Sequence, residues 1–202
     1  MIRYAFIHQQ ILNIYRDLPE IRFPIDPHEV ITMLPNCRFL SYQQFAELNG
    51  CSIKDVIRLC ESRSGCTHYD AVNGRYLILC NQSTDWNNNE GRQRWTCGHE
   101  IGHVICGHHL LSANEKLSEN GMLCVKPEFE AEADYFSATL LAPFPLFRCL
   151  DINSADDVKS VFGLSCEASF NQYEQYERWK KSHRKTAWEN DIVKIYLMKE
   201  CV

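Results

Sequence analysis

The chain has 202 residues, of which 45% are hydrophobic and 23% charged, and its formal net charge is −5. This composition is typical of a soluble globular protein, and the length suits one domain, which we expect to span residues 1–202. The acidic balance disfavours direct binding to nucleic acid, because a nucleic-acid-binding domain normally presents a basic face.

Targeting signals and cysteines point to the same compartment. No apolar run approaches the ~20 residues of a membrane-spanning helix, and residues 1–10 lack the apolar stretch and cleavage site of a signal peptide. The eleven cysteines are scattered and include no C-x-x-C pair, so they indicate neither a disulfide framework nor a zinc ribbon. Reduced thiols are typical of a cytoplasmic protein, which is the location we expect.

The N-terminal region reads as mostly helical. Apolar residues recur at helical spacing in residues 2–16, which predicts an amphipathic helix. After a proline-rich linker, Asp26 and Pro27 are typical of the start of a helix, which we expect to extend to Leu34. Residues 38–42 are predicted to form a short strand.

Residues 41–59 have the spacing of a helix-turn-helix, with a turn at Gly50 between two helical patterns. The only basic residues in this stretch are Lys54 and Arg58, so it lacks the basic surface that DNA recognition needs. We therefore favour two packing helices, with a DNA-binding role as the alternative.

A hairpin is predicted next. Residues 69–72 and 75–80 flank the dipeptide Asn73-Gly74, which is favoured in type I′ turns. The apolar strand Tyr76–Cys80 would align an extended peptide by β-addition if its edge is free. The polar residues 81–91 are expected to form a loop.

The central motif lies in a partly apolar helical stretch, Arg94 to His109, and reads H-E-x-x-H at residues 99–103. His99 and His103 are four residues apart, so they lie on one face of a helix, where their rings can share a metal ion. Glu100 lies about 100° round the helix, from where it can reach a water without being a ligand. This arrangement is typical of a zinc hydrolase in which the carboxylate is the catalytic base.

A second helix is predicted to supply the third ligand. It begins at Pro127 and ends before Pro143. Glu130 and Asp134 are four residues apart and share one face of this helix. We favour Glu130 as the third ligand. Asp134 would accept the other ring N–H of a ligand histidine and fix its tautomer.

Alternatives to Glu130 exist. His109 falls where a metzincin places its last histidine, although Cys106 stands where that pattern needs glycine. Glu132 lies roughly 200° round the helix from Glu130, so we expect it to point away and its replacement to leave metal binding unchanged. The residue that stabilises the oxyanion is not evident; the candidates are His108, His109 and Tyr135.

The remaining segments are less specific. Residues 112–126 are expected to connect the two metal-bearing helices, and a connection of this length can cover a site. Residues 155–162 and 166–181 are predicted to be helices, the second carrying aromatic residues that pack in the core. Residues 187–202 show no pattern that predicts a structure.

Three segments together resemble the ImmA/IrrE family of bacterial metallopeptidases. They are R-W-T-x-x-H-E-I-G-H at residues 94–103, E-x-E-A-D-x-F-x-A-x-L-L-x-P at 130–143 and F-G-L-S-x-x-A at 162–168. The first motif is shared by many zincins, whereas the second, at this spacing, is the specific one. The likeness covers roughly residues 70–170. Cys97-Gly98 stands where the family usually has Leu-Ala, and neither residue is a catalytic group.

The resemblance implies an α+β fold with a thermolysin-like zincin core. A small sheet containing antiparallel strands would pack on the H-E-x-x-H helix and on the second ligand-bearing helix. We expect an N-terminal helical part at 1–65, a metal-binding core at 66–145 and C-terminal helices at 146–202. His99, His103 and Glu130 would be the ligands.

The resemblance also implies a cytoplasmic zinc endopeptidase, with Glu100 as its catalytic base. Family members typically cut a helix-turn-helix repressor of a mobile element or a stress response, so a protein substrate is expected, and no nucleic acid or membrane. The ligand types suit zinc and also accept manganese. A metal-binding module that captures a repressor without cutting it is the alternative.

Overall fold

The computed structural model describes residues 1–83, 89–112, 126–182 and 186–200. The predicted connection at 112–126 lies almost entirely outside these residues. The described part is an α+β fold, as the sequence predicted: helices surround one small sheet, and the C-terminal part is helical. No helix among the described residues combines the length and apolarity needed to cross a membrane.

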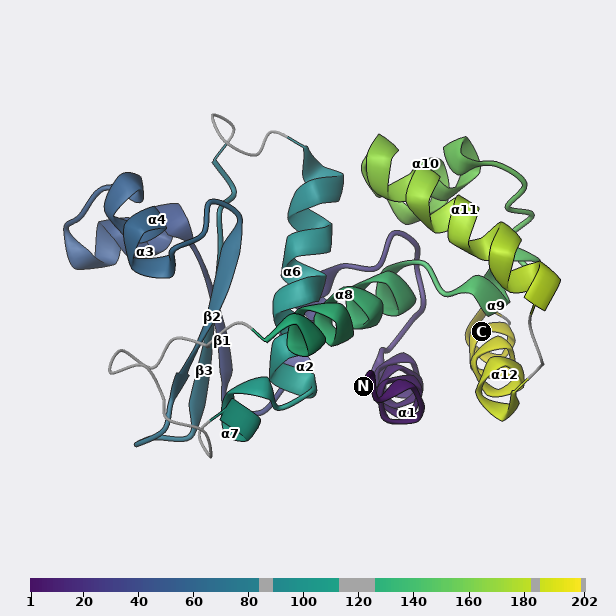
Figure 1. Cartoon of the computed structure of the whole chain (residues 1–202), viewed down its shortest axis with the longest axis horizontal. Helices are drawn as coiled ribbons and strands as arrows, with labels where there is room; N and C mark the ends of the chain where they lie inside the picture. The colour runs from purple at the N-terminus through teal and green to yellow at the C-terminus, as the bar shows by residue number, and fades with distance from the viewer. Residues whose placement is uncertain (84–88, 113–125, 183–185, 201–202) are drawn as a thin grey trace.

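Figure 1 shows the elements in chain order. The first half contains α1 (Tyr4–Asp17), α2 (Pro27–Met33), β1 (Cys37–Ser41), α3 (Tyr42–Asn49), α4 (Ile53–Cys60), β2 (Gly65–Asp70) and β3 (Arg75–Cys80). The second half contains α6 (Glu90–Ile105), α7 (His108–Ser112), α8 (Pro127–Leu141), α9 (Phe144–Phe147), α10 (Ala155–Phe162), α11 (Cys166–Ser182) and α12 (Ala187–Glu200). The sequence patterns did not predict α7 or α12.

The sheet has the strand order β1-β3-β2, with β1 parallel to β3 and β2 antiparallel to it. Strand β3 is therefore central, and both of its edges are paired. The condition set for β-addition to Tyr76–Cys80, a free edge, is therefore not met. Strand β2 lies at an edge of the sheet, and α6 contacts both β2 and β3.

The hairpin between β2 and β3 has a longer turn than predicted. The last paired residues are Asp70 and Arg75, and only Gly74 in the turn has a positive φ, of 62°. A type I′ turn needs positive φ at Asn73 as well, so that prediction is wrong. The Asp70 carboxylate instead accepts hydrogen bonds from the backbone N–H groups of Val72 and Asn73 and holds the turn.

Helices α3 and α4 pack on the face of the sheet away from α6 (Figure 1), through a small cluster that contains Tyr42, Val56 and Leu79. They confirm the two helices expected at residues 41–59. Arg58 pairs with Asp55 at 2.9 Å, so the region gains no basic face.

A disulfide joins Cys60, at the end of α4, to Cys66 in β2. This corrects the expectation that all cysteines are reduced. The pairing could not be predicted from the spacing of the cysteines, which matches no disulfide framework; the fold brings the two Cα atoms to 5.7 Å from each other. Other described cysteines are free: Cys37, Cys51, Cys80, Cys97, Cys106, Cys149 and Cys166.

Helices α6 and α8 approach closely because glycine lies at their contact. A Cβ atom at Gly102 would be 3.0 Å from the Cα of Ala133, and one at Gly98 would be 2.7 Å from the Oγ of Ser137. Because the two helix axes are close, side chains of α6 can contact side chains of α8.

The turn after α10 packs on the start of α6. A Cβ atom at Gly91 would be 2.5 Å from the backbone of Leu164 and Ser165. The Arg94 guanidinium donates a hydrogen bond to the carbonyl of Gly163, which has a φ of 60°. These contacts give the third sequence motif a structural role in holding the helix that carries H-E-x-x-H.

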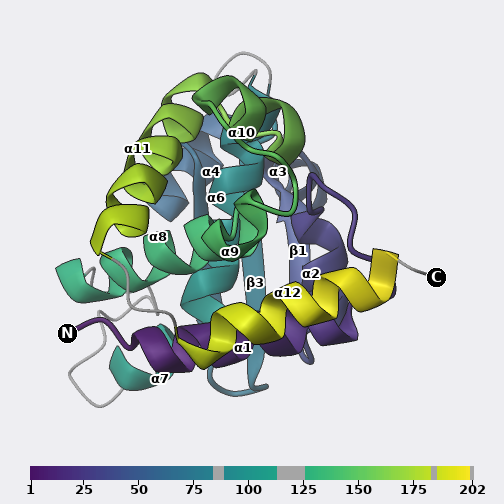
Figure 2. The same cartoon turned by 90° about the vertical axis from the view of Figure 1, so that its right-hand side faces the viewer.

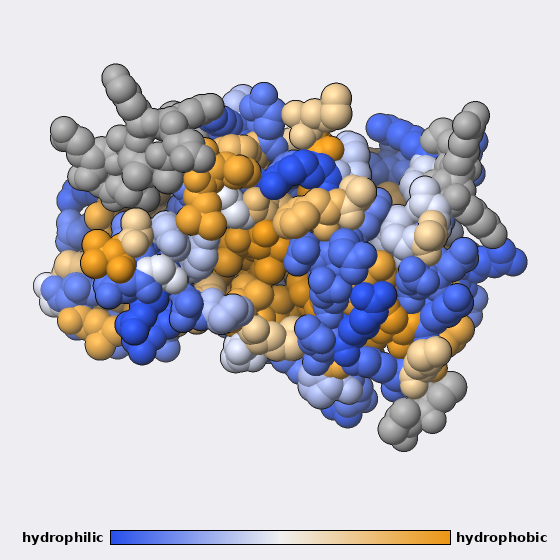
Figure 3. Space-filling model, turned by 90° about the horizontal axis from the view of Figure 1, so that it is seen from below, coloured by the Kyte–Doolittle hydropathy of each residue, from blue (hydrophilic) through white to orange (hydrophobic). Residues whose placement is uncertain are grey.

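One large hydrophobic core extends from α1 through α8 to α12. Figure 2 shows α12 lying along α1, and the Lys199 ammonium donates to the Arg16 carbonyl at 2.7 Å. Apolar side chains also reach the surface: Figure 3 shows them gathered in the middle of one face between hydrophilic margins. Some exposure of this kind is ordinary in soluble proteins.

Candidate metal centre

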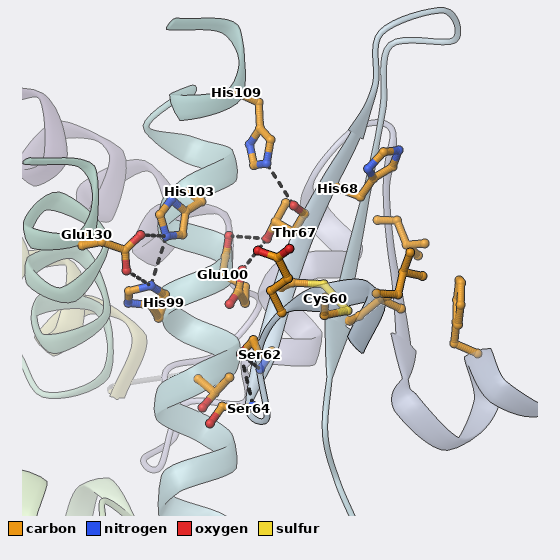
Figure 4. A pocket seen from close by; sticks show the side chains of 18 of the residues that line it. Cys60, Ser62, Ser64, Thr67, His68, His99, Glu100, His103, His109 and Glu130 are labelled. Atoms are coloured by element: carbon orange, nitrogen blue, oxygen red, sulfur yellow. Dashed lines mark hydrogen bonds and ion pairs between the residues drawn. A yellow bond between two sulfur atoms is a disulfide. The ribbon is translucent and has the colours of Figure 1, made fainter. Parts of the chain in front are cut away.

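The two histidines of the motif and Glu130 converge between α6 and α8 (Figure 4). The Nε2 atoms of His99 and His103 are 3.0 Å apart. The two Glu130 carboxylate oxygens face one nitrogen each, with Oε2 at 3.3 Å from Nε2 of His99 and Oε1 at 3.3 Å from Nε2 of His103. The structure thus brings together the three residues that the sequence analysis favoured as ligands.

Asp134 lies on the far side of His99. Its carboxylate oxygen is 2.9 Å from Nδ1 of His99, one helical turn beyond Glu130 on α8. A carboxylate can only accept, so Nδ1 carries a hydrogen, and Nε2, which faces Glu130, offers its lone pair when the ring is neutral.

The electrostatics of this cluster fit a cation. Burial alone would lower the pKa of His99, but hydrogen bonds to Asp134 and Glu130 outweigh burial and raise this pKa to about 10. Hydrogen bonds from His103 and His99 hold the pKa of Glu130 well below its usual value. Two ring nitrogens and a carboxylate at this spacing therefore favour a shared positive charge, and this donor set suits zinc.

Glu100 lies beside the three candidate ligands, but its carboxylate contacts β2. Its carboxylate is buried and accepts a hydrogen bond from the Thr67 hydroxyl of β2 at 2.7 Å. Burial raises the pKa of Glu100, although His103 and His99 oppose this effect. A Cβ atom at Gly65 would lie 3.2 Å from the other carboxylate oxygen, so glycine lets β2 pass close to Glu100.

A cavity of about 1030 Å³ opens between β2, α6 and the α3–α4 pair. Its lining includes His99, Glu100, His103 and Glu130 on one side and Thr67 on the other, as Figure 4 shows. The cavity is large enough to receive several residues of an extended peptide next to the candidate metal ligands.

The outer edge of β2 borders this cavity. The Asn81 N–H donates to the Ser64 carbonyl at 2.8 Å, so these two residues form a hydrogen-bonded pair of the antiparallel ladder. Hydrogen-bonded and non-hydrogen-bonded pairs alternate along the two strands from there. In that alternation the backbone groups of Gly65, Thr67 and Tyr69 point away from β3. Among the described residues no strand pairs with this edge of β2, which lies beside the candidate ligands.

His109 does not join the ligand cluster. Its Nε2 atom lies 3.0 Å from the Thr67 carbonyl, where the ring N–H can donate to β2. Burial lowers the pKa of His109 to about 4, so the ring is neutral. Of the three oxyanion candidates, only His109 lines the cavity, whereas the Tyr135 hydroxyl lies 2.6 Å from Nε2 of His8 on α1.

The other rival, Glu132, points away from His99, as helix geometry predicted. Its carboxylate pairs with Arg3, with Nη2 and Oε2 2.5 Å apart. It also lies 3.0 Å from Nε2 of His108, whose Nδ1 is 2.9 Å from Nδ1 of His103. Sequence reasoning missed this connection, because His108 follows the end of α6 and belongs to no helical pattern with His103.

One protein-family model matches the chain. It is Peptidase M78, described as the IrrE N-terminal-like domain, and it covers residues 64–169. The matched segment begins at the start of β2 and runs through α6, α8 and α10 into α11. No curated protein matches the chain.

Proposed function

Because the chain belongs to the Peptidase M78 family, whose model covers more than half of it, we propose that it is a zinc-dependent endopeptidase. The observation that carries the proposal is the convergence of His99, His103 and Glu130 beside the buried Glu100. A metal site with a purely structural role would not need Glu100, because this carboxylate is not one of the three candidate ligands and lines the cavity.

His99, His103 and Glu130 would hold the ion through two imidazole nitrogens and a carboxylate. This ligand set favours zinc and also accepts manganese. A bound zinc ion would supply a Lewis acid that polarises the scissile carbonyl and lowers the pKa of a water molecule.

Glu100 would act as the general base and then as the general acid. A water oxygen bonds to the carbonyl carbon as a proton passes to the Glu100 carboxylate. The carboxyl group then gives this proton to the peptide nitrogen as the C–N bond breaks. The Thr67 hydroxyl, 2.7 Å from one carboxylate oxygen, would hold Glu100 in position.

The substrate would bind as an extended strand along β2. The Gly65 N–H already donates to the Ser62 hydroxyl at 3.2 Å, which leaves the outward Gly65 carbonyl and the outward backbone groups of Tyr69 to pair with a peptide by β-addition. A protein substrate must therefore expose or locally unfold the segment that is cut. We propose a helix-turn-helix repressor as this protein; the support for this choice is the family resemblance alone.

The experiment compares the wild-type protein with Glu100→Gln, both loaded with zinc. The targets are repressor proteins encoded by neighbouring genes, and the readout is their fragments. We expect Glu100→Gln to keep zinc and to lose about 10²–10⁴-fold in cleavage rate. Glu128→Gln, at an exposed position in the first turn of α8, is the control and should cleave normally.

A fully active Glu100→Gln variant would rule out this mechanism. If the wild-type protein instead forms a stable complex with a repressor and produces no fragments, the capture module becomes the better description.

A further inference from the structure

We propose that Arg3, Glu132 and His108 form a positioning relay that fixes the ring of His103 for metal binding; this inference rests on the proposed metal site. The relay starts at Arg3, before α1, and ends at Nδ1 of His103, the ring nitrogen that does not face Glu130. Its members come from three separate parts of the chain, so they meet only in the folded protein.

The contacts are continuous from one residue to the next. Nδ1 of His103 lies 2.9 Å from Nδ1 of His108, and Nε2 of His108 lies 3.0 Å from Oε2 of Glu132. The Arg3 backbone N–H donates to Oε1 of Glu132 at 2.7 Å. Its guanidinium donates to both carboxylate oxygens, at 2.5 and 3.0 Å for Oε2 and at 3.0 Å for Oε1.

With both imidazoles neutral, these contacts allow one arrangement of hydrogens. The Glu132 carboxylate only accepts, so Nε2 of His108 must carry a hydrogen and donate it. In a neutral imidazole the other nitrogen is then an acceptor, so Nδ1 of His103 must donate to Nδ1 of His108. The lone pair of His103 is thereby placed on Nε2, the atom that faces Glu130 and the candidate metal position.

The relay is held rigidly. His108 is fully buried and Glu132 is 3% exposed, so neither side chain can exchange its partner for bulk water. The Phe129 ring stacks on His108 with 4.4 Å between ring centroids. The Arg3 guanidinium also donates to the Cys106 carbonyl at 2.8 Å, which ties the relay to the end of α6.

Arg3 and Asp134 would each orient one of the two histidine ligands. Asp134 acts directly on His99, whereas Arg3 acts through Glu132 and His108 on His103. A buried carboxylate without a cationic partner is costly, so Glu132 needs Arg3 to remain charged at this position.

A second metal site is the alternative interpretation of this part of the structure. Cys106, His108 and Glu132 present donor atoms within 4.8 Å of one another, a spacing that would also suit a metal ion. The Arg3 guanidinium already contacts both oxygens of Glu132, and a second cation there would be repelled. The geometry therefore favours a hydrogen-bonded relay over a second metal site.

The relay predicts an effect of Glu132 that differs from the expectation from the sequence. Glu132 points away from the ligand cluster, as predicted, but it reaches His103 through His108. Its replacement should therefore weaken metal binding, whereas helix phase alone led us to expect no effect.

The test measures zinc affinity of the full-length protein by competition with a chromophoric chelator. We expect His108→Phe to weaken binding about 10–100-fold, the usual range for residues that orient a metal ligand. Arg3→Met and Glu132→Gln should weaken it in the same direction by a smaller factor. Arg16→Met, at an exposed position of helix α1, is the matched control and should bind as the wild type does.

A second readout separates positioning from general loss of structure. In the zinc-loaded wild-type protein, the Nδ1 protons of His99 and His103 should both give slowly exchanging downfield NMR signals. The His103 signal should disappear in His108→Phe, while the His99 signal, protected by Asp134, should remain. If His108→Phe does not fold, the affinities of Arg3→Met and Glu132→Gln decide the question.

Unchanged zinc affinity in all the folded variants would overturn the relay, as would two zinc ions per chain. A wild-type protein that binds no zinc would count against the proposed function itself. The two failures are therefore distinguishable in one titration series.

Discussion

At the scale of single residues, Glu130 differs from its acidic neighbours on α8 in what its carboxylate contacts. It faces the Nε2 atoms of His99 and His103, whereas Glu128 is exposed. We predict that Glu130→Ala retains no zinc after gel filtration, because two imidazoles alone make a weak site. Glu128→Ala should retain one zinc per chain, as measured by elemental analysis. Equal zinc content in both variants would show that the third ligand is another residue.

Thr67 is the other residue whose contact has a direct chemical consequence. Its hydroxyl donates to the Glu100 carboxylate, and Thr67→Val keeps the shape of the side chain without the donor. A hydrogen bond to a charged group contributes about 1.5–3 kcal/mol, so we predict a loss of about tenfold or more in cleavage rate. Zinc content should not change, because Thr67 contacts no ligand side chain. A variant that cleaves at the wild-type rate would show that Glu100 needs no support from β2.

Sequence periodicity could predict the residues that share a helix face. The four-residue spacings of His99 with His103 and of Glu130 with Asp134 follow from helix geometry, and the structure brings these residues together. Thr67, His108 and Arg3 could not be predicted in this way. Arg3 and Glu132 are 129 positions apart, and their contact depends on how α1 packs against α8.

At the scale of elements, the distance between α6 and α8 controls the ligand spacing. A Cβ atom at Gly102 would meet the backbone of Ala133, which cannot move without shifting α8. We predict that Gly102→Ala destabilises the zinc-free protein by about 1–3 kcal/mol in denaturant unfolding and weakens zinc binding. A Cβ atom at Gly98 would meet side-chain atoms instead, at 2.7 Å from the Ser137 Oγ and 3.4 Å from Leu141 Cδ1. The Ser137 hydroxyl can rotate away at the loss of its hydrogen bond to the Trp95 carbonyl, so the effect of Gly98→Ala on both quantities should be smaller. The reverse order would contradict the role assigned to this contact.

The order of the strands shows where local patterns fail. The hairpin of β2 and β3 was predicted, but whether β3 has a free edge could not be, because its second partner is β1, which lies further back in the chain, before α3, α4 and β2. The continuous apolar run Leu77-Ile78-Leu79 is typical of a strand covered on both faces, and it was a sign that β3 is central.

At the scale of the whole molecule, metal binding and folding should be coupled. The ligands come from α6 and α8, and the relay adds the segment before α1, so an ion would hold these parts together. A zinc concentration 100 times the dissociation constant adds about 2.7 kcal/mol of stability, or roughly 5–11 °C in Tm for a chain of this size. We predict this rise for the wild-type protein in thermal melts with zinc relative to melts with chelator. Glu130→Ala is the control and should melt at one temperature in both conditions. A wild-type Tm that does not respond to zinc would indicate that the ion does not join these elements.

The central claim is that one metal ion lies between His99, His103 and Glu130, next to Glu100. Anomalous diffraction at the zinc absorption edge from zinc-loaded crystals tests this claim most directly. We predict a single peak per chain, about 2.0–2.3 Å from the two Nε2 atoms and from a Glu130 carboxylate oxygen. A peak at Cys106, His108 and Glu132 instead, or no peak after loading, would contradict the claim.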